Sequence, residues 1–327
     1  MATEYLLTRM LDLQLMISIF TVLHYTYIIY VTLRSKSVVF RSAFFVIFRF
    51  TSFFDIIGIF VVEWIRSDQK VGFGPSVKLV TRSMYAMIGV ILFTHFIGCL
   101  LMTTNRFTAI CCPWAYEKIW SRKSVHIMLV TTFIVAVGVH FRLFFSQFIY
   151  ERRNDMWELV GRSKFPVIRM IRCFTVVFYV CISMLLVSRT IYTIVKMDSS
   201  SRCKQRMVQS NGMAHCQGGS VACGVISSRS RPKSKGLIAL VTIDCLLGIV
   251  RCIYELANLL NLNDANVVFN WVHQNVTFTF FVTMSVNAYS ITFLSRDLRR
   301  EVFVPCRRKL GYWQPSTVTT TVVISKF

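Results

Sequence analysis

The 327-residue sequence has few charged residues, and acidic residues are the scarcer kind. Charged residues make up 16% of the chain, against roughly 25% in ordinary globular proteins. Hydrophobic residues make up 54%, and the mean hydropathy is +0.55. A soluble domain of this size is usually less apolar, so we expect lipid to surround much of the chain. The net charge of +22 would suggest nucleic acid in a soluble protein. Here it is first assigned to loops, because Lys and Arg decide membrane orientation.

The sequence also lacks the common signatures of enzymes. It has no G-x-S-x-G, H-E-x-x-H or P-loop motif. No two of its six histidines lie four residues apart, a spacing with which a helix can bind a metal. The 11 cysteines include no C-x-x-C pair, which argues against a zinc or redox framework. We therefore expect no enzyme activity, no cofactor, no metal and no nucleic acid partner.

Long apolar runs dominate the sequence. A bilayer core of roughly 30 Å needs about 20 apolar residues in a helix, whereas a barrel strand needs only about 9–11 alternating residues. The runs here have helical length, and they lie at 10–33, 43–65, 83–110, 125–149, 165–195, 236–260 and 268–294. The sequence predicts an all-α membrane protein, with a bundle of seven transmembrane helices in residues 1–310 and a cytoplasmic tail at 311–327.

The distribution of basic residues predicts the orientation of these spans. Cytoplasmic loops carry an excess of Lys and Arg. If the N-terminus is outside, the cytoplasmic segments carry 23 basic residues and the outer segments carry 12. We therefore expect the N-terminus outside and the C-terminus inside the cell.

Transporters are less well supported by this pattern. They commonly contain inverted repeats and helices broken by Gly or Pro at matching positions. Seven spans do not divide evenly, and almost none of the six prolines falls inside a span. A channel is harder to exclude, because a pore leaves weak marks in a sequence. A seven-span ion channel or transporter subunit therefore remains the alternative to a receptor.

Two basic segments are expected on the inner side. Residues 196–235 contain nine Ser, eight Lys or Arg and one acidic residue, which is typical of a flexible loop. Such a loop is attracted to anionic membrane lipids, and it is also a possible dock for a cytoplasmic partner. After the last span, apolar residues recur every four positions among arginines, which predicts a short amphipathic surface helix at 295–308. Cys306 is a candidate for reversible palmitoylation, with an unmodified cysteine as the alternative.

Ionisable side chains inside the predicted spans are costly, so each is a hypothesis for a functional site. Arg49 and Asp55 lie in the second span, six residues apart and on different helix faces. They are therefore not expected to pair with each other. A structural link to a neighbouring helix is the alternative role for both residues.

The sixth span carries the clearest polar stripe. Asp244, Arg251 and Glu255 are spaced by seven and four residues, which places them on one face of a helix. Arg251 and Glu255 can pair at this spacing. We expect Arg251 and Glu255 to line a cavity that opens outward and binds a small external molecule. The alternative is a salt-bridge network that only holds helices together.

The seventh span begins with polar and aromatic residues. Trp271, His273 and Gln274 give its outer end hydrogen-bonding character, which suits the mouth of a ligand pocket. An interface belt, where amphipathic rings sit at the level of the headgroups, is the alternative.

The stretch NRFTAICCPWAYEKIW, residues 105–120, ends the third span. Arg106 lies where a long side chain can reach water and headgroups, and Pro113 stops regular helix. We expect Arg106 to act as a charged switch between two helix packings. An ordinary interfacial anchor is the alternative.

This stretch resembles the segment that closes the third span in nematode serpentine receptors of class gamma. The likeness is gapless over residues 105–120 and includes Asn105, Arg106, Tyr116, Glu117 and Lys118. It implies a G-protein-coupled chemosensory receptor in the plasma or ciliary membrane of a sensory neuron. It also implies that a heterotrimeric G protein is a partner, and these five residues would lie on its side of the membrane.

Overall fold

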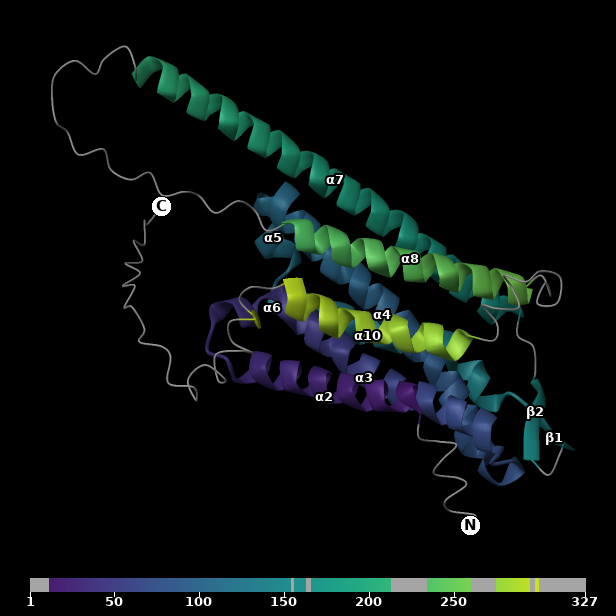
Figure 1. Ribbon diagram of the computed structural model, residues 1–327. Helices are drawn as coiled ribbons and strands as arrows, with labels where there is room; N and C mark the ends of the chain where they lie inside the picture. The colour runs from purple at the N-terminus through teal and green to yellow at the C-terminus, as the bar shows by residue number, and fades with distance from the viewer. Residues whose placement is uncertain are drawn as a thin grey trace, which may run out of the picture.

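Figure 1 shows the protein as a computed structural model, which describes residues 12–153, 156–162, 166–212, 234–259, 275–294 and 298–299. Within these ranges it has seven long helices: α2 (Leu13–Arg34), α3 (Ala43–Val71), α4 (Lys78–Cys111), α6 (Arg122–His140), α7 (Pro166–Gly212), α8 (Ser234–Leu259) and α10 (Val276–Leu294). The shorter elements are the 3-10 turns η1 (Val38–Arg41), η2 (Pro75–Val77) and η3 (Phe141–Phe145), the helix α5 (Pro113–Ile119), and the strands β1 (Phe148–Arg153) and β2 (Met156–Arg162).

The long helices have the dimensions of membrane spans. Six of them, all except α8, are long and apolar enough to cross a membrane. The remaining helix, α8, has 26 residues, which corresponds to about 39 Å and exceeds a bilayer core of roughly 30 Å. The predicted all-α bundle with seven long helices is therefore confirmed.

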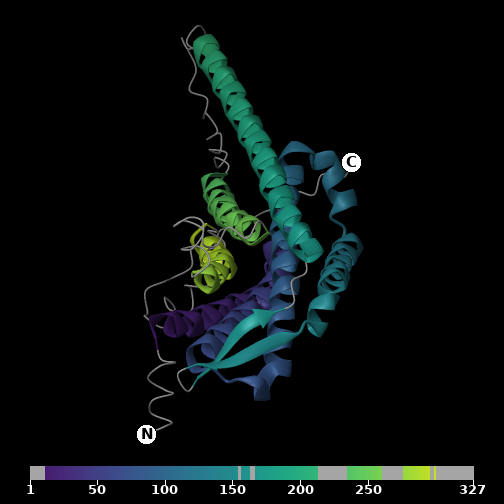
Figure 2. The same cartoon turned by 90° about the vertical axis from the view of Figure 1, so that its right-hand side faces the viewer.

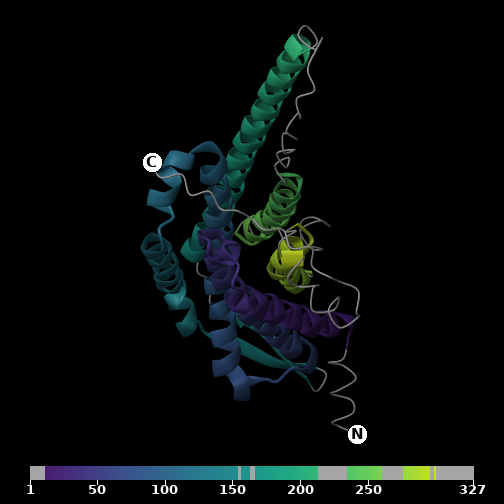
Figure 3. The same cartoon turned by 90° about the vertical axis from the view of Figure 1, so that its left-hand side faces the viewer.

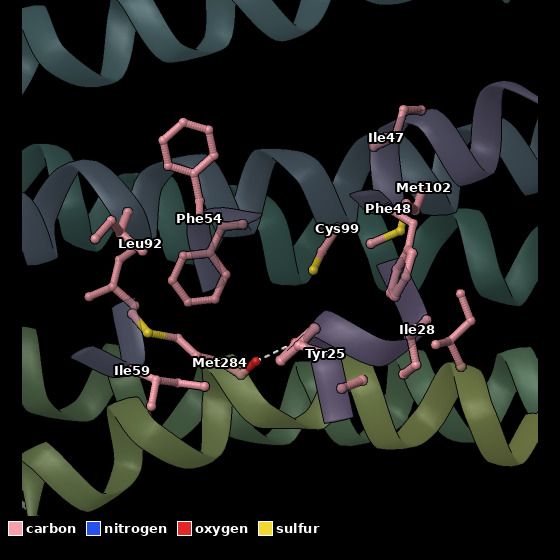
Figure 4. Packing of buried hydrophobic residues seen from close by; sticks show 14 of the residues in the cluster. Tyr25, Ile28, Ile47, Phe48, Phe54, Ile59, Leu92, Cys99, Met102 and Met284 are labelled. Carbon is pink, nitrogen blue, oxygen red and sulfur yellow. Dashed lines mark hydrogen bonds between the residues drawn. The ribbon is translucent and has the colours of Figure 1, made fainter. Parts of the chain in front are cut away.

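The helix α4 occupies the centre of the bundle. In an apolar stretch of 18 residues within α4, 72% of the residues are buried, against 28% in the corresponding stretch of α2 and 22% in that of α6. Its close contact with α3 depends on Gly98, because a Cβ atom there would lie 2.2 Å from Thr51 Oγ1. Small residues let two membrane helices approach closely. Figure 4 shows the apolar core beside this contact, where α2, α3, α4 and α10 contribute Tyr25, Phe48, Cys99 and Met284, among others.

The two ends of the bundle differ, and we call them the hairpin end and the α5 end. The antiparallel strands β1 and β2 cross the first end, while α5 and the long extension of α7 lie at the other (Figures 2 and 3). At the hairpin end, α3 closes at Gly72, whose φ of 66° is the left-handed conformation that ends many helices. A Cβ atom on Gly74 would lie 2.4 Å from the Trp157 ring. The hairpin is therefore packed directly against the turn between α3 and α4.

The hairpin corrects the predicted fourth span. The apolar run at 125–149 was expected to be one helix, but α6 ends at His140 and β1 begins at Phe148. Hydropathy does not distinguish a helix from a strand in an apolar segment. The end of the run forms a strand that pairs with β2. In this pairing, Phe148 lies opposite Arg162 and Arg153 lies opposite Met156.

The helix α7 is longer than the sequence indicated. It continues to Gly212, through the first part of the segment 196–235 that was predicted to be a flexible loop. Extending an existing helix is much easier than nucleating one, and Lys, Arg, Gln and Met are good helix formers. Residues 213–233 lie outside the described residues.

The end of the chain is described only in part. Leu298 and Arg299 are helical, with Leu298 fully buried and Arg299 exposed. These two residues lie within the amphipathic helix predicted at 295–308, which stays a prediction. The other residues of that segment, including the palmitoylation candidate Cys306 and the tail at 311–327, lie outside the described residues.

At the hairpin end, an ionic cluster joins α2 to α3. Asp12 caps the start of α2 by accepting a 2.9 Å hydrogen bond from the Leu15 backbone N–H, and it forms ion pairs with Arg66 and Lys70. Burial alone would raise the pKa of Asp12. Hydrogen bonds from Lys70, the Leu15 backbone and Arg66 outweigh this effect and lower the pKa to about 2. Asp12 is therefore held as a carboxylate.

Candidate functional site

A small cavity lies between α4, α6, α7 and α8, in the half of the bundle nearer the hairpin. Its volume is about 20 Å³. Its apolar wall consists of Gly89, Leu92, Phe93, Phe96 and Val176. The polar lining residues are His140, Arg172, Thr175 and Arg251. The cavity is thus a small, mostly apolar space on which a few polar groups converge.

His140 and Arg172 form one polar wall of this cavity. His140 Nδ1 lies 2.9 Å from the Ala136 carbonyl oxygen, so Nδ1 must donate the hydrogen. Arg172 Nε donates a hydrogen bond of 3.3 Å to His140 Nε2. His140 Nε2 must then be an acceptor, which identifies the neutral tautomer. His140 therefore orients the Arg172 guanidinium.

Close packing at Gly89 holds this pair of side chains in place. A Cβ atom on Gly89 would lie 2.4 Å from His140 Cδ2 and 2.6 Å from Arg172 Nη2. The absence of a side chain at this position on α4 lets both polar groups reach the cavity.

Arg251, on α8, is a further polar residue of the cavity lining. The predicted pair with Glu255 is present, and both side chains are buried. The Arg251 guanidinium carbon also lies 3.9 Å from the centre of the Phe280 ring and 4.9 Å from that of Tyr254. These contacts orient the guanidinium group beside the cavity.

Besides Cys306, four predicted site residues cannot be placed. Trp271, His273 and Gln274 lie outside the described residues. Asp244 belongs to α8, but its side chain is not among those described. The predicted stripe on the sixth span is therefore established only for Arg251 and Glu255.

A second polar group lies at the centre of the bundle, around Asp55. His95 Nδ1 lies 2.7 Å from Asp55 Oδ1, and the Tyr25 hydroxyl lies 3.0 Å from Asp55 Oδ2. The same hydroxyl lies 2.5 Å from the Met284 carbonyl oxygen, as the dashed line in Figure 4 shows. Asp55 is therefore connected to α2 and α4 directly and to α10 through Tyr25. This is the link to neighbouring helices that the sequence analysis gave as its alternative role.

This central cluster continues to the Cys99 thiol and to α10. Cys99 Sγ lies 3.7 Å from His95 Nε2, and Asn287 Nδ2 donates to Cys99 Sγ at 3.3 Å. The sequence analysis did not select His95, Cys99 or Asn287. A histidine inside an otherwise uncharged apolar run was the available signal, because buried polar groups in spans are costly.

Arg49 makes a separate link between α2 and α3. Its Nη1 donates a hydrogen bond of 3.4 Å to the Thr32 carbonyl oxygen. As predicted, Arg49 does not pair with Asp55; it contacts the backbone of a neighbouring helix instead.

At the α5 end, the short helix α5 folds back against α4. Asn105 Nδ2 donates a hydrogen bond of 3.3 Å to the Tyr116 hydroxyl, and Trp120 Nε1 donates one of 2.6 Å to Thr108 Oγ1. The sequence analysis identified Asn105 and Tyr116 but not the second pair. The motif thus folds on itself, with its polar side chains joining the two helices.

The charged residues of this motif lie at the surface. Glu117 and Lys118 are exposed. Arg106 is also exposed, and its guanidinium carbon lies 4.0 Å from the centre of the Phe44 ring on α3. In this packing, Arg106 therefore contacts an aromatic ring of a neighbouring helix.

A wider groove opens beside α5. Its volume is about 270 Å³, and its lining includes Arg41, Tyr116, Glu117, Arg122 and His126. The groove brings the start of α3, the helix α5 and the start of α6 together at one surface.

The sequence matches the family model described as serpentine type 7TM GPCR chemoreceptor Srv, over residues 14–307. The chain belongs to this family. The match covers all seven long helices, which are therefore the seven transmembrane helices of an Srv receptor. A search of curated proteins found no matching relative.

Membership of the Srv family confirms the main functional expectations. The protein is a G-protein-coupled chemosensory receptor and a multi-pass membrane protein. The family is a receptor family, not an enzyme family. The resemblance noted at residues 105–120 correctly predicted a serpentine chemoreceptor, but the family that matches is Srv, and class gamma is not tested by this match.

Proposed function

We propose that this Srv receptor binds a small external molecule in the cavity beside Arg172 and Arg251. A heterotrimeric G protein then binds at the α5 end, at Asn105, Arg106, Tyr116, Glu117 and Lys118. In this proposal, the hairpin and the N-terminus face outward and the C-terminus faces the cytoplasm. The class gamma likeness of residues 105–120 supports a sensory neuron, in its plasma or ciliary membrane, as the site of action.

The observation that carries this proposal is the position of three polar sites along α4. Gly89 lies at the cavity, His95 belongs to the central cluster, and Asn105 contacts α5. One helix in the middle of the bundle therefore touches the cavity, the core and the inner surface. A ligand that favours one packing of α4 shifts the population of receptors toward that packing.

The family match also favours a receptor over the alternative of a seven-span channel or transporter. The groove at the α5 end also supports a receptor. Its lining is basic and aromatic, which suits the binding of a G protein once α4 has shifted. Arg106 lies next to this region, where its contact with Phe44 links α4 to α3.

Signalling in a heterologous cell tests this proposal. Cells that express the receptor and a G-protein reporter are screened with volatile and water-soluble odorants. An active compound is then compared on the wild type and on Arg106→Ala. We expect a loss of potency of about 10-fold or more, since coupling energies of 1–3 kcal/mol correspond to roughly 5–150-fold.

Arg34→Ala is a matched control, because Arg34 is also an exposed arginine that contacts an aromatic ring, here Tyr30. Surface expression of each variant is measured in parallel. Unchanged signalling by Arg106→Ala at equal surface expression would contradict its role as a switch.

Glu255→Gln tests the ligand side of the proposal. This variant leaves the Arg251 guanidinium without its carboxylate, so the potency of a cavity ligand is expected to change. If no active compound changes in potency, the cavity is not the ligand site.

A further inference from the structure

We infer that Cys173 and Cys252 are a modification site, where a peroxide converts two thiols into a reversible disulfide between α7 and α8. The two Sγ atoms lie 3.9 Å apart, although the residues are 79 positions apart in the sequence. Both cysteines are free thiols, and both are half-buried. The inference goes beyond the proposed function and does not depend on it, because the disulfide is detected without a ligand or a G protein.

The packing of α7 against α8 holds the two thiols opposite each other. Gly248 lies one turn before Cys252, and a Cβ atom on it would lie 2.8 Å from Val180 Cγ2 and 3.8 Å from Val176 Cγ1. The missing side chain lets the two helices approach closely. One turn further along α8, Cys252 meets Cys173, which lies almost one turn back along α7 from Val176. This is the register of two antiparallel helices in close contact.

The gap between the two sulfur atoms can be closed by side-chain rotation. A disulfide bond is about 2.05 Å long, so the sulfur atoms must approach each other by about 2 Å. Each Sγ atom is carried by one rotatable bond and moves between staggered positions. A movement shared by both side chains therefore brings the sulfur atoms to bonding distance.

The pair lies toward the hairpin end of the bundle. Cys173 lies two turns after the start of α7 at Pro166, and Cys252 lies two turns before the end of α8 at Leu259. Two turns of helix correspond to about 11 Å. In the proposed orientation this end faces the outside of the cell, where disulfides persist. Hydrogen peroxide is small and uncharged, so it can reach half-buried thiols at this depth.

The reaction proceeds in two steps. One thiol attacks the peroxide, whose O–O bond breaks; this sulfur becomes a sulfenic acid, and one water molecule leaves. The second thiol then attacks the sulfenic sulfur, the S–S bond forms, and a second water molecule leaves. Two thiols and one hydrogen peroxide thus give one disulfide and two water molecules. A thiol reductant reverses the change by exchange.

The close contact makes the second step faster than the competing oxidation. Apolar surroundings favour the thiol over the reactive thiolate, so the first step is expected to be slow. The sulfenic acid then has its partner thiol in contact, which gives a high effective concentration. A disulfide is therefore expected before a second peroxide produces the irreversible sulfinic acid.

The disulfide would act at the cavity, because each cysteine follows an arginine of its lining. Cys173 comes directly after Arg172, and Cys252 comes directly after Arg251. A covalent bond at this level fixes the spacing of α7 and α8 where both helices line the cavity.

Peptide mapping of the purified receptor tests the inference. The full chain in detergent is treated with hydrogen peroxide, the remaining thiols are blocked with N-ethylmaleimide, and the protein is digested without reductant. Mass spectrometry is expected to find one cross-linked species that contains Cys173 and Cys252 and is two hydrogen atoms lighter than the two peptides together. Dithiothreitol added before the block is expected to remove this species.

The cross-link is also expected to raise the Tm, because it closes a long loop in the unfolded chain. The oxidised wild type is compared with the same protein after reduction. Cys252→Ser is expected to show neither the cross-link nor an oxidant-dependent rise in Tm. Cys181→Ser is the matched control, because Cys181 is an exposed cysteine about two turns further along α7. It is expected to behave like the wild type.

The wild-type digest decides the matter even if Cys252→Ser folds poorly. The inference is wrong if no peptide joins Cys173 to Cys252, if peroxide yields only sulfinic or sulfonic acid at these positions, or if another pair of cysteines accounts for the rise in Tm. The proposed function is judged separately, by ligand potency. Unchanged potency in a fully cross-linked receptor would count against the cavity as the ligand site and leave the disulfide established.

Discussion

At the residue scale, Asp55 is the acceptor that connects the helices at the centre of the receptor. Its two carboxylate oxygens lie at hydrogen-bond distance from His95 on α4 and Tyr25 on α2. All three side chains are fully or almost fully buried. Leaving a buried polar group without its hydrogen-bond partner costs more free energy than the hydrogen bond contributes to stability.

Asp55→Ala is therefore expected to destabilise the receptor strongly, by about 3–5 kcal/mol, because it leaves His95 Nδ1 buried without its partner. The measurement is a thermal unfolding curve of the purified receptor. The double variant Asp55→Ala with His95→Leu is expected to lose less than the sum of the two single variants, since they share one interaction. Strictly additive losses would show that the two side chains act independently.

Gly98 sets the distance between α3 and α4. Gly98→Ala would place a methyl group 2.2 Å from Thr51 Oγ1, and the short β-branched threonine has little freedom to move away. We expect a loss of about 1–3 kcal/mol, the usual effect of overpacking.

The control for this prediction is Gly138→Ala, where the added methyl group meets open space. Alanine favours a helix over glycine by roughly 1 kcal/mol, so this variant is expected to be at least as stable as the wild type. Equal Tm values for the two alanine variants would argue against close packing at Gly98.

At the element scale, α2 is held to α3 at the hairpin end mainly by charge. In an apolar stretch of 18 residues within α2, 28% of the residues are buried, so the packing of α2 against the bundle is limited. Asp12 contributes both the helix cap and the ion pairs with Arg66 and Lys70. Glu63 accepts hydrogen bonds from Ser18, at 2.6 Å, and from Arg66 Nε, at 2.8 Å.

The pH dependence of stability tests this arrangement. The pKa of Asp12 is lowered from 3.8 to about 2 in the folded receptor. A lowered carboxyl pKa stabilises the folded state above pH 3.8, and this contribution is lost as the pH falls toward 2. Asp12→Asn keeps a capping side chain but removes the charge. We expect its Tm to be lower than that of the wild type at neutral pH.

The difference between the two Tm values is then expected to be constant from pH 7 to about 5 and to shrink below pH 4, as Asp12 of the wild type is protonated. A difference that stays the same in acid would show that the charge of Asp12 is not its source. High salt gives a further check, because it screens partly exposed ion pairs.

At the scale of the whole molecule, the two ends of the bundle have different structures. The hairpin covers one end, and α5 with the extension of α7 occupies the other (Figure 1). The predicted orientation places the hairpin outside, because the loops at the α5 end carry more Lys and Arg.

Labelling of intact cells tests this orientation. With an epitope at each terminus, the N-terminal tag is expected to be accessible to antibody before permeabilisation and the C-terminal tag only afterwards. An accessible C-terminus with a protected N-terminus would contradict the orientation and, with it, the assignment of the cavity to the outer side.

The sequence predicted the parts of this receptor that depend on local patterns. Apolar runs of about 20 residues identified the spans, since one helix must satisfy its own backbone inside a bilayer. The pairing of Arg251 with Glu255 followed from the helical repeat, because both residues lie on the same element. The dense motif at 105–120 identified a serpentine chemoreceptor.

Only the tertiary structure decided which residues meet across helices. His95 joins Asp55, and Arg172 joins His140, because α4, α6 and α7 pack with particular rotations about their axes. The hydropathy of the sequence does not predict these rotations, because an apolar helix face can point either toward lipid or toward the core. The hairpin was missed because hydropathy does not distinguish a strand from a helix in a short apolar segment. Its strands pair with each other, and the structure packs them on Gly74 of the turn between α3 and α4.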